Sequence, residues 1–153
     1  MTLEFIRNCN IFRDFTTEQK AFLYRMLEER RYTKDEIIVE EGAVDKTLYL
    51  IYSGSVRVLK KTDMGEEVEI AFITAGNYFG EFSLIDHEPR SASVVAFEDS
   101  LVYQLNLLSY TELCRLHPEV EVKMLKGFLL DTVTKLRNSS VDAAVTQGFL
   151  LSL

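Results

Sequence analysis

The middle of the chain consists of short apolar runs separated by turn residues. Between about residues 35 and 107, runs such as TLYLIYSGSVRVLKK and EVEIAFITAG resemble strands, and Gly54, Gly65 and Gly76 mark turns. Alternating apolar and polar residues are typical of a half-buried strand. Turn signals every 8–12 residues or so are typical of a sandwich, a jelly roll or a small barrel. The pattern therefore predicts a mainly β fold of one of these three kinds.

A helical pattern precedes these strands. Thr16 and Gln19 stand three residues apart, which is a capping-box signature for the start of a helix. The apolar residues that follow recur at helical spacing and predict a helix from about Glu18 to Glu29. The segment FIRNCNIF before it is expected to form a short helix or a turn.

A second helical region follows the strands. Ser109 and Glu112 form another capping-box signature, and Pro118 is expected to break or restart the helix. An apolar stripe then runs over four turns, with spacings of 3, 4, 4 and 3 residues. It consists of Val122, Leu125, Leu129, Val133 and Leu136, and it is widened by Met124, Phe128 and Leu130. Two interpretations stay open: the helix lies on its own barrel, or the stripe forms a dimer seam, since coiled coils share this spacing.

The charge balance argues against nucleic acid as a direct partner. The chain has 24 acidic and 17 basic side chains, a net charge of -7 and no basic stripe. Proteins that bind DNA use Lys and Arg to neutralise phosphates. A small anionic ligand stays compatible with this balance, because it needs only a local group of donors.

Three further features indicate a protein of the cytoplasm. No apolar run approaches the roughly 20 residues of a membrane span, so no membrane partner is expected. The start of the chain, MTLEFIRNCN, lacks the pattern of a secretory signal. Cys9 and Cys114 lie far apart and form no CxxC pair, so a disulfide framework is not expected and a reducing compartment fits.

The stretch GEFSLIDHEPRSASV, residues 80–94, combines groups that suit a phosphate. Arg90 is the one Lys or Arg between Lys61 and Arg115, and its planar fork matches phosphate oxygens. Gly80 allows a close backbone approach, and the residues after it can open a helical turn whose free N–H groups point at an anion. The stretch therefore predicts a phosphate cradle.

Glu81 and the serines after Arg90 fit the same interpretation. Ser91 and Ser93 are small donors, and an ionised Glu81 accepts hydrogen bonds only, which suits ribose hydroxyls rather than phosphate. A simpler interpretation is an exposed salt bridge between Glu81 and Arg90, a kind of pair worth about 0–1 kcal/mol. The residues alone leave both interpretations open.

Several short motifs along the chain occur together in one known family. They are EEG, LYLIYSGSVRV, AGNYFGE and PRSASV, framed by the leading and closing helices, and nine positions separate Glu81 from Arg90. Over nearly its whole length the sequence resembles the cyclic-nucleotide-binding domain family, which includes the bacterial catabolite activator and the regulatory subunits of cyclic-AMP-dependent protein kinase. The resemblance implies a mainly β fold with flanking helices: a β jelly-roll (double-stranded β-helix) with an N-terminal helix and C-terminal closing helices.

The resemblance also implies a single domain over residues 1–153. Its parts are expected to be N-terminal helices to about residue 32, a jelly roll over 33–108, closing helices over 109–145 and an apolar tail over 146–153.

The family's phosphate-binding cassette falls on residues 79–94. The resemblance implies that backbone donors after Phe79 approach the cyclic phosphate, that Glu81 takes the ribose 2′-hydroxyl, that Arg90 pairs with the phosphate, and that apolar barrel residues pack on the purine. The implied ligand-binding residues are Phe79, Gly80, Glu81, Phe82, Ser83, Arg90, Ser91, Ala92, Val58 and Ile70. A cap over the base is expected from the C-terminal helix, with Asp131, Thr132, Thr134, Lys135 and Asn138 as candidates.

The ligand implied by the resemblance is cyclic AMP, and less strongly cyclic GMP. In the family, threonine after the arginine goes with cyclic GMP and alanine with cyclic AMP, whereas this chain has Ser91, as the bacterial activators do. No cofactor and no metal are expected.

Some positions depart from the family pattern. Ala43 and Asp45 stand where Asp and Gly are common, which is expected to affect a turn and not the ligand site. His87 replaces a common glycine and is given no role, and His117 is expected to be structural.

The output predicted from the resemblance is a ligand-induced population shift that a protein partner reads. The chain ends at Leu153 with no room for a helix-turn-helix module, which indicates a stand-alone sensor or a fragment of a longer chain. A homodimer through the C-terminal helix is an alternative partner.

Two other functions were weighed against this one. A degenerate family member would hold no nucleotide and act as an interaction module, but the presence of both Glu81 and Arg90 argues against it. A metal-dependent cupin enzyme would need clustered histidines, whereas His87 and His117 are the two histidines and lie in different elements. The protein is therefore not expected to be an enzyme.

Overall fold

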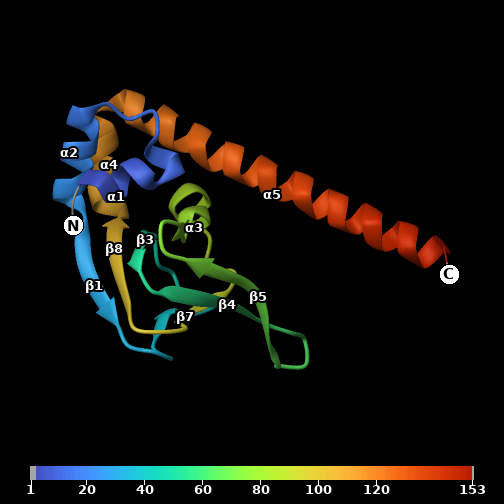
Figure 1. The fold of residues 1–153 in the computed structure, drawn as a ribbon. Helices are drawn as coiled ribbons and strands as arrows, with labels where there is room; N and C mark the ends of the chain where they lie inside the picture. The colour runs from blue at the N-terminus through green and yellow to red at the C-terminus, as the bar shows by residue number, and fades with distance from the viewer. Residues whose placement is uncertain (1–2, 153) are drawn as a thin grey trace.

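The chain folds into antiparallel strands flanked by helices, in a computed structural model that describes the backbone of residues 3–152 and the side chains of residues 4–139. The helices are α1 (Leu3–Asn8), the 3-10 helix η1 (Asn10–Phe12), α2 (Thr17–Met26), α3 (Glu81–Asp86), α4 (Leu107–Leu116) and α5 (Pro118–Ser152). The strands are β1 (Glu28–Tyr32), β2 (Ile37–Val39), β3 (Thr47–Ser53), β4 (Ser55–Lys61), β5 (Glu67–Thr74), β6 (Tyr78–Phe79), β7 (Ser93–Ala96) and β8 (Ser100–Asn106). Figure 1 shows α1, α2 and α4 gathered at one end of the strands, with α5 leading away from that end past α3.

Within the described residues the strands form two four-stranded sheets. Their orders are β1-β8-β3-β6 and β2-β7-β4-β5, and every pairing is antiparallel. Strands distant in sequence are neighbours in both sheets, as in β8 between β1 and β3. This is the predicted jelly roll with flanking helices.

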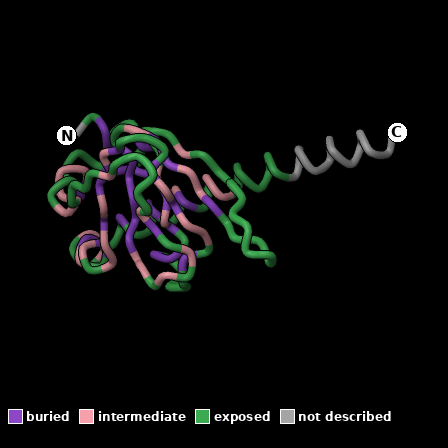
Figure 2. Tube along the Cα trace, turned by 90° about the horizontal axis from the view of Figure 1, so that it is seen from below, coloured by how far each residue is buried: buried purple, intermediate pink, exposed green. Residues whose placement is uncertain are grey.

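Two groups of buried side chains hold the fold together. The first joins the helices to the sheet that contains β8 and includes Phe12, Leu105 and Leu113. The second includes Ile51 and Val56 and lies where the two sheets face each other. Figure 2 shows that the buried segments lie inside the body, whereas the described part of α5 becomes exposed as it leaves the body. Burial of this kind contributes roughly 25 cal/mol per Å² of apolar surface removed from water.

The first helical prediction is confirmed at its start and wrong at its end. Thr16 accepts a hydrogen bond from the Gln19 backbone, and the Gln19 side chain accepts one from Thr16, so the capping box is present. Helix α2 ends at Met26, and the segment EERRY that follows is strand β1, which pairs with β8. Glu and Arg favour helices, but pairing with an adjacent strand overrides a weak local preference. The jelly roll therefore begins at Glu28 rather than near residue 33.

The second capping-box prediction is wrong. The N-cap of α4 is Asn106, whose side chain accepts from the Ser109 backbone N–H at 2.8 Å. Glu112 instead bonds Arg115 at the helix surface. Asn and Ser are comparably good caps, so the last strand residue can take the role that the sequence pattern gave to Ser109. The predicted restart at Pro118 is confirmed, because α5 begins there.

Helix α5 packs on the rest of the chain through the edge of the predicted stripe rather than through its centre. Its buried residues are Val120, Met124 and Phe128, which belong to the cluster shared with α1 and α4. Gly127 allows close contact with η1, because a Cβ there would lie 3.2 Å from the Cα of Ile11. The five central residues of the predicted stripe are exposed: Val122, Leu125, Leu129, Val133 and Leu136. The helix therefore packs on its own domain, as one interpretation expected, but through Met124 and Phe128 at the edge of the stripe and not through these five residues.

The apolar tail predicted over 146–153 lies in the part of the chain where no side chains are described. Its backbone continues α5 as far as Ser152.

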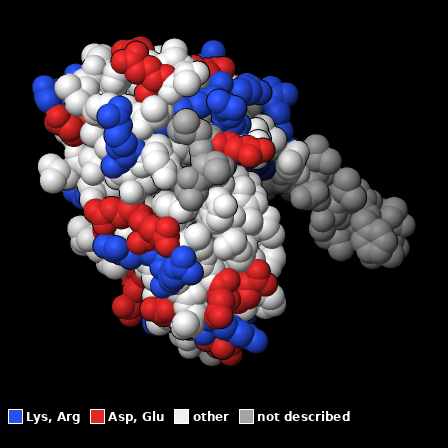
Figure 3. Space-filling view, turned by 60° about the vertical axis from the view of Figure 1, so that its left-hand side comes forward, with Lys and Arg blue, Asp and Glu red and all other residues white. Residues whose placement is uncertain are grey.

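Charges of both signs share the surface. On the face shown in Figure 3, Lys and Arg groups lie beside Asp and Glu groups. None of the described helices combines the length and apolar character needed to cross a membrane. In the same described residues, no group of three or more His, Cys, Asp and Glu side chains is placed to hold a metal ion.

Candidate functional site

A cavity of about 280 Å³ lies between the strands, α3 and α5. Small-molecule sites typically occupy about 300–1,000 Å³, so this cavity is just below the lower limit of that range. Its wall includes all ten residues predicted to bind the ligand, from Val58 through Ala92. The wall residues that the sequence analysis did not name as ligand contacts are Val39, Ile73, Tyr78 and Val94.

Arg90 occupies the polar end of the cavity. Its side chain is buried, with Nη1 donating to the Gly80 carbonyl at 2.8 Å and Nη2 donating to the Thr47 carbonyl at 2.7 Å. Nη2 also meets Asp45 Oδ2 at 3.0 Å, and the guanidinium lies over the Tyr49 ring. The Nε atom is buried and has no hydrogen-bond partner among the described residues. A buried donor without a partner is costly, so an anion oxygen at this atom would remove a penalty.

Gly80 makes the close approach of Arg90 possible. Its φ is 88°, in the left-handed region that favours glycine. A Cβ at this position would lie 2.6 Å from the Thr47 carbonyl oxygen and 2.8 Å from Arg90 Nη1. Gly80 is also the N-cap of α3, and the first turn of that helix lines the cavity with N–H groups that have no intrahelical acceptor.

Glu81 is the second buried charged group of the cavity. Its side chain is only 8% exposed. Burial raises the pKa of Glu81 above its ordinary value, and the charges of Lys135 and Arg90 oppose that shift in part. The ion pair of Arg90 is formed with Asp45, so the simpler interpretation of residues 81 and 90 as an exposed salt bridge is wrong. A carboxylate buried in a cavity wall can accept hydrogen bonds from hydroxyl groups of a ligand.

Asp45 belongs to this site, contrary to the expectation that it concerns a turn alone. Besides its contact with Arg90, it accepts a hydrogen bond from the Tyr49 hydroxyl at 2.6 Å. Burial pushes the pKa of Asp45 upward, but hydrogen bonds from Tyr49 and Thr47 and the charge of Arg90 outweigh it, so the pKa lies below its ordinary value. The carboxylate is therefore ionised at neutral pH and balances the charge of Arg90.

The apolar part of the wall is shaped by a β-bulge. Val58 pairs with Ala71 but Leu59 pairs with Glu69, which leaves Ile70 as an extra residue in β5. The bulge shifts the alternation, so both Ile70 and Ile73 line the cavity. Simple alternation from Ile70 could not have found Ile73, because it places residues 70 and 73 on opposite faces.

One of the five predicted base-cap residues lines the cavity, namely Lys135. Asp131 lies one step away, because its Oδ2 accepts from the hydroxyl of the wall residue Tyr78 at 2.6 Å. Thr132 and Thr134 instead donate to helix carbonyls four residues earlier. Asn138 is exposed and does not line the cavity.

Phe79 of the cavity wall packs against Tyr49 of β3. Their rings stack with centroids 4.8 Å apart and planes nearly parallel. The pair fixes the strand that leads into Gly80, because β6 and β3 are also hydrogen-bonded at this point.

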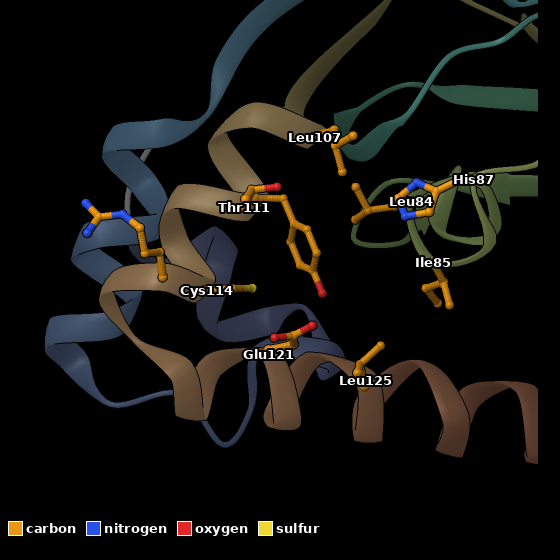
Figure 4. A pocket seen from close by; sticks show the side chains of 10 residues that line it. Leu84, Ile85, His87, Leu107, Thr111, Cys114, Glu121 and Leu125 are labelled. Atoms are coloured by element: carbon orange, nitrogen blue, oxygen red, sulfur yellow. The ribbon is translucent and has the colours of Figure 1, made fainter.

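A larger cavity of about 510 Å³ lies on the other side of α3 (Figure 4). Leu84 and Ile85 of α3 face Cys114 of α4 and Leu125 of α5 across it. It lacks a buried cation, so the smaller cavity is the candidate ligand site. Helix α3 is shared by both, with its first turn at one and its last turn at the other.

Comparison with known proteins identifies the family. Residues 29–117 match a profile described as the cyclic nucleotide-binding domain. The chain belongs to the cyclic-nucleotide-binding domain family. This match covers more than half of the 153 residues and includes the whole wall except Lys135.

Relatives of this cyclic-nucleotide-binding domain include regulatory proteins. The chain is 25% identical over 124 residues to a cAMP-dependent protein kinase regulatory subunit of Blastocladiella emersonii, covering 81% of this chain and 31% of the relative. It is 34% identical over 110 residues to a cyclic AMP receptor protein of Thermus thermophilus, covering 72% and 51%. The chain thus spans about half the length, or less, of these curated relatives.

A solved cyclic nucleotide-binding domain from Methylobacillus flagellatus has the same fold. Its TM-score is 0.79 at 30% identity, and the match covers 90% of this chain and 77% of the other.

The two histidines of the domain occupy helix ends. His87 is the C-cap of α3 and has φ 61°, the left-handed conformation that explains why the family often has glycine there. His117 caps the end of α4 and packs against the Phe22 ring with centroids 5.0 Å apart.

Proposed function

We propose that this domain is a sensor module that binds a cyclic nucleotide in the 280 Å³ cavity. The cyclic phosphate meets Arg90, the first turn of α3, and Ser91. The ribose 2′-hydroxyl donates to Glu81, and the purine packs on Val58 and Ile70. Lys135 approaches the base from α5.

The unpaired Nε of Arg90 is the observation that carries this proposal. The rest of the guanidinium is held by two backbone carbonyls and Asp45, so its direction is fixed before any ligand arrives. The cyclic phosphate brings one negative charge, and charge-assisted bonds to a buried arginine are among the strongest hydrogen bonds in proteins. Apolar surface next to a fixed cation suits a ligand that carries both an anion and a flat ring.

Calorimetry with cyclic AMP tests the proposal through Arg90→Leu. Removal of one partner of a buried charge pair typically costs about 3–5 kcal/mol, so binding should become undetectable. Arg57→Leu is the matched control, because Arg57 is exposed, pairs with Glu69 and does not line the cavity. Arg90→Lys keeps the positive charge but loses the planar guanidinium group. Circular dichroism shows which of the variants fold. Unchanged affinity in folded Arg90→Lys and Arg90→Leu proteins would refute the assignment.

We propose cyclic AMP as the ligand, with cyclic GMP as the weaker one. The two curated relatives described above are named for cyclic AMP, and Ser91 stands where threonine goes with cyclic GMP. In competition experiments, cyclic AMP should show a lower dissociation constant than cyclic GMP. Ser91→Thr should bring the two dissociation constants closer together. A wild-type preference for cyclic GMP would reverse this part of the proposal.

A second candidate function is a domain that holds no nucleotide and serves as an interaction module. The observation that favours it is Asp45, whose carboxylate already neutralises Arg90. Thermal unfolding discriminates the two, because a ligand at 100 times its dissociation constant adds about 2.7 kcal/mol to stability. No shift of the melting temperature with either nucleotide would favour the interaction module.

We infer that α3 and α5 pass the signal to a protein partner. Helix α3 separates the two cavities, and α5 reaches the ligand cavity through Lys135 and the Asp131–Tyr78 hydrogen bond. A ligand that binds one arrangement of these helices better than another shifts their populations. Hydrogen exchange should therefore change in residues 81–86 and around Asp131 when cyclic AMP binds, and much less in β1. An equal response in β1 would contradict this route.

The exposed stripe on α5 supports a homodimer as one form of partner. Analytical ultracentrifugation of the wild type should show a dimer that Leu129→Lys disrupts, because a charge placed in a coiled-coil seam opposes its burial. Lys126→Ala, an exposed polar position on the same helix, is the control. A wild-type monomer at high concentration would exclude this partner.

A further inference from the structure

Lys60 on β4 touches the cassette from outside the cavity wall. Strand β4 pairs with β7 as far as Leu59 and Ser93, so the next residues, Lys60 and Ala92, lie opposite each other beyond the end of the ladder. From this place the Lys60 Nζ donates to the carbonyl oxygen of Ser91 and forms an ion pair with Glu41 at 2.9 Å. We propose that Lys60 and Glu41 are positioning residues that hold the peptide between Ser91 and Ala92 in the orientation that receives a nucleotide.

The bond to Lys60 decides which way this peptide faces. The described chain contains no cis peptide, so the C=O of Ser91 and the N–H of Ala92 point in opposite directions. Lys60 does not line the cavity, whereas Ser91 and Ala92 do, and its bond turns the Ser91 carbonyl toward β4. In this proposal the Ala92 N–H, on the opposite side of the peptide from the carbonyl, is the group presented to the anion.

The neighbouring backbone is already fixed on the Arg90 side. The Gly42 N–H donates to the Arg90 carbonyl at 2.8 Å, and the Arg90 N–H donates to the Ala43 carbonyl at 2.9 Å. Farther along, the Glu41 N–H donates to Ser93 Oγ at 2.8 Å. The peptide after Ser91 lies between these anchors, and its carbonyl accepts a hydrogen bond from Lys60.

Glu41 holds the ammonium group in place. Its carboxylate contacts Lys60 and also accepts from the Lys61 backbone N–H at 3.3 Å. The hydrogen bond with Lys60 lowers the pKa of Glu41, so the carboxylate is ionised at neutral pH. The Lys60 side chain is about half exposed and the Glu41 side chain is 20% exposed, so solvent screens part of this ion pair and its contribution to folding is modest. Loss of Lys60 should therefore affect the ligand site more than overall stability.

Lys60→Met and Lys61→Met form a matched pair for the test. Both remove one positive charge at adjacent positions, but Lys60 is the one whose side chain contacts Ser91 of the cassette and Glu41 beside it. We expect Lys60→Met to raise the dissociation constant of cyclic AMP about tenfold, the effect of one charge-assisted hydrogen bond. Lys61→Met should change it less than about twofold, because exposed charges are screened by salt. Lys60→Arg should restore binding to within about threefold, and Glu41→Gln should weaken it about threefold.

Two measurements separate positioning from a structural role. Melting temperatures of the Lys60 and Lys61 variants should agree within about 2 °C, since both residues are exposed. In the ligand-free protein, the amide NMR signal of Ala92 should move in Lys60→Met and stay in Lys61→Met. Equal affinity losses in both variants would mean that long-range charge alone acts, and an unmoved Ala92 signal would mean that Lys60 does not orient the peptide; either result overturns the proposal.

This inference rests on the proposed nucleotide binding, and the two can fail separately. If the wild type binds no cyclic nucleotide while the Ala92 signal still responds to Lys60→Met, the proposed function fails and the peptide anchor stands. If the wild type binds and Lys60→Met binds equally well, the positioning role alone is wrong.

Discussion

The two ends of the ligand cavity are built from different kinds of contact. At the polar end Arg90 is 6% exposed, and three acceptors fix its nitrogens. At the apolar end Ile70 is 58% exposed and meets no comparable restraint. The polar end is therefore complete before a ligand arrives, whereas the apolar end stays open to water.

This difference predicts where binding free energy depends on single atoms. A preorganised charged group loses little freedom on binding, and nothing nearby can replace it when it is altered. Apolar contacts add up over area, so each of them matters less. Mutations should therefore have steep effects at the polar end and shallow effects at the apolar end.

Gly80→Ala should give the largest effect of the four variants below. A Cβ at Gly80 would collide with the Thr47 carbonyl and with Arg90 Nη1. We expect about hundredfold weaker binding of cyclic AMP and a loss of roughly 2–4 kcal/mol in stability. Gly42→Ala is the control: its φ of 84° is as unfavourable, but no atom lies within 4 Å of the added Cβ. Similar losses of affinity in both variants would show that backbone strain, and not a collision with Arg90, causes the weaker binding.

Glu81→Gln should weaken cyclic AMP by about tenfold, because a charge-assisted bond to the ribose becomes a neutral one. Glu81→Gln should nevertheless make the folded protein more stable than the wild type at neutral pH. The pKa of Glu81 is raised in the folded protein, so the ionised form is disfavoured there, and wild-type stability falls as pH rises from the unfolded pKa through the folded pKa. Melting curves against pH should show this fall in the wild type and a smaller one in Glu81→Gln. An identical pH profile would mean that Glu81 is not the buried titrating group.

Asp45→Asn should tighten binding about five- to tenfold. The amide keeps the shape of the side chain but no longer neutralises Arg90, so the phosphate meets a full positive charge. The ligand-free protein should lose about 1–2 kcal/mol, a modest cost because the Asp45 side chain is 31% exposed. Calorimetry checks whether binding becomes tighter, and the melting temperature checks whether the ligand-free protein becomes less stable. Weaker binding in a folded Asp45→Asn protein would show that Asp45 orients Arg90 rather than competing for it.

The polar end was largely predictable from the sequence because short motifs fix it. Glu81 and Arg90 were named from their residue types and from the family resemblance, and both lie in the cavity wall. Asp45 was missed because it comes from a loop 45 positions before Arg90, and no local pattern reports such a contact. The one hint in the sequence is that Asp45 is an acidic residue at a position where the family commonly has glycine.

Periodic patterns in the sequence predicted helices and strands better than they predicted which side chains of each element are buried. The bulge in β5 lets both Ile70 and Ile73 line the wall, and Asn106 takes the helix cap that the spacing predicts for Ser109. On α5 several apolar faces are possible, and packing buries Val120 together with Met124 and Phe128 at the edge of the predicted stripe rather than its central residues. Strand pairing and helix docking are tertiary choices, so a one-dimensional period cannot decide among them.

Ile70→Ala should give the smallest of the four effects and tests the apolar end directly. Because the side chain is more than half exposed without ligand, its loss removes mainly the surface that the base would cover. At roughly 25 cal/mol per Å², this corresponds to about three- to fivefold weaker binding.

Phe72→Ala is the control for Ile70→Ala. Phe72 is also exposed and lies two positions along β5, but it packs on Phe97 at 5.1 Å and does not line the cavity. Binding of cyclic AMP to Phe72→Ala should match the wild type, because the bulge at Ile70 separates the two side chains. If Ile70→Ala lost as much affinity as Glu81→Gln, the apolar end would be as restrictive as the polar end. Equal losses in Ile70→Ala and Phe72→Ala would instead indicate a general weakening of β5, and the contrast between the two ends would then rest on strand stability rather than on contact with the base.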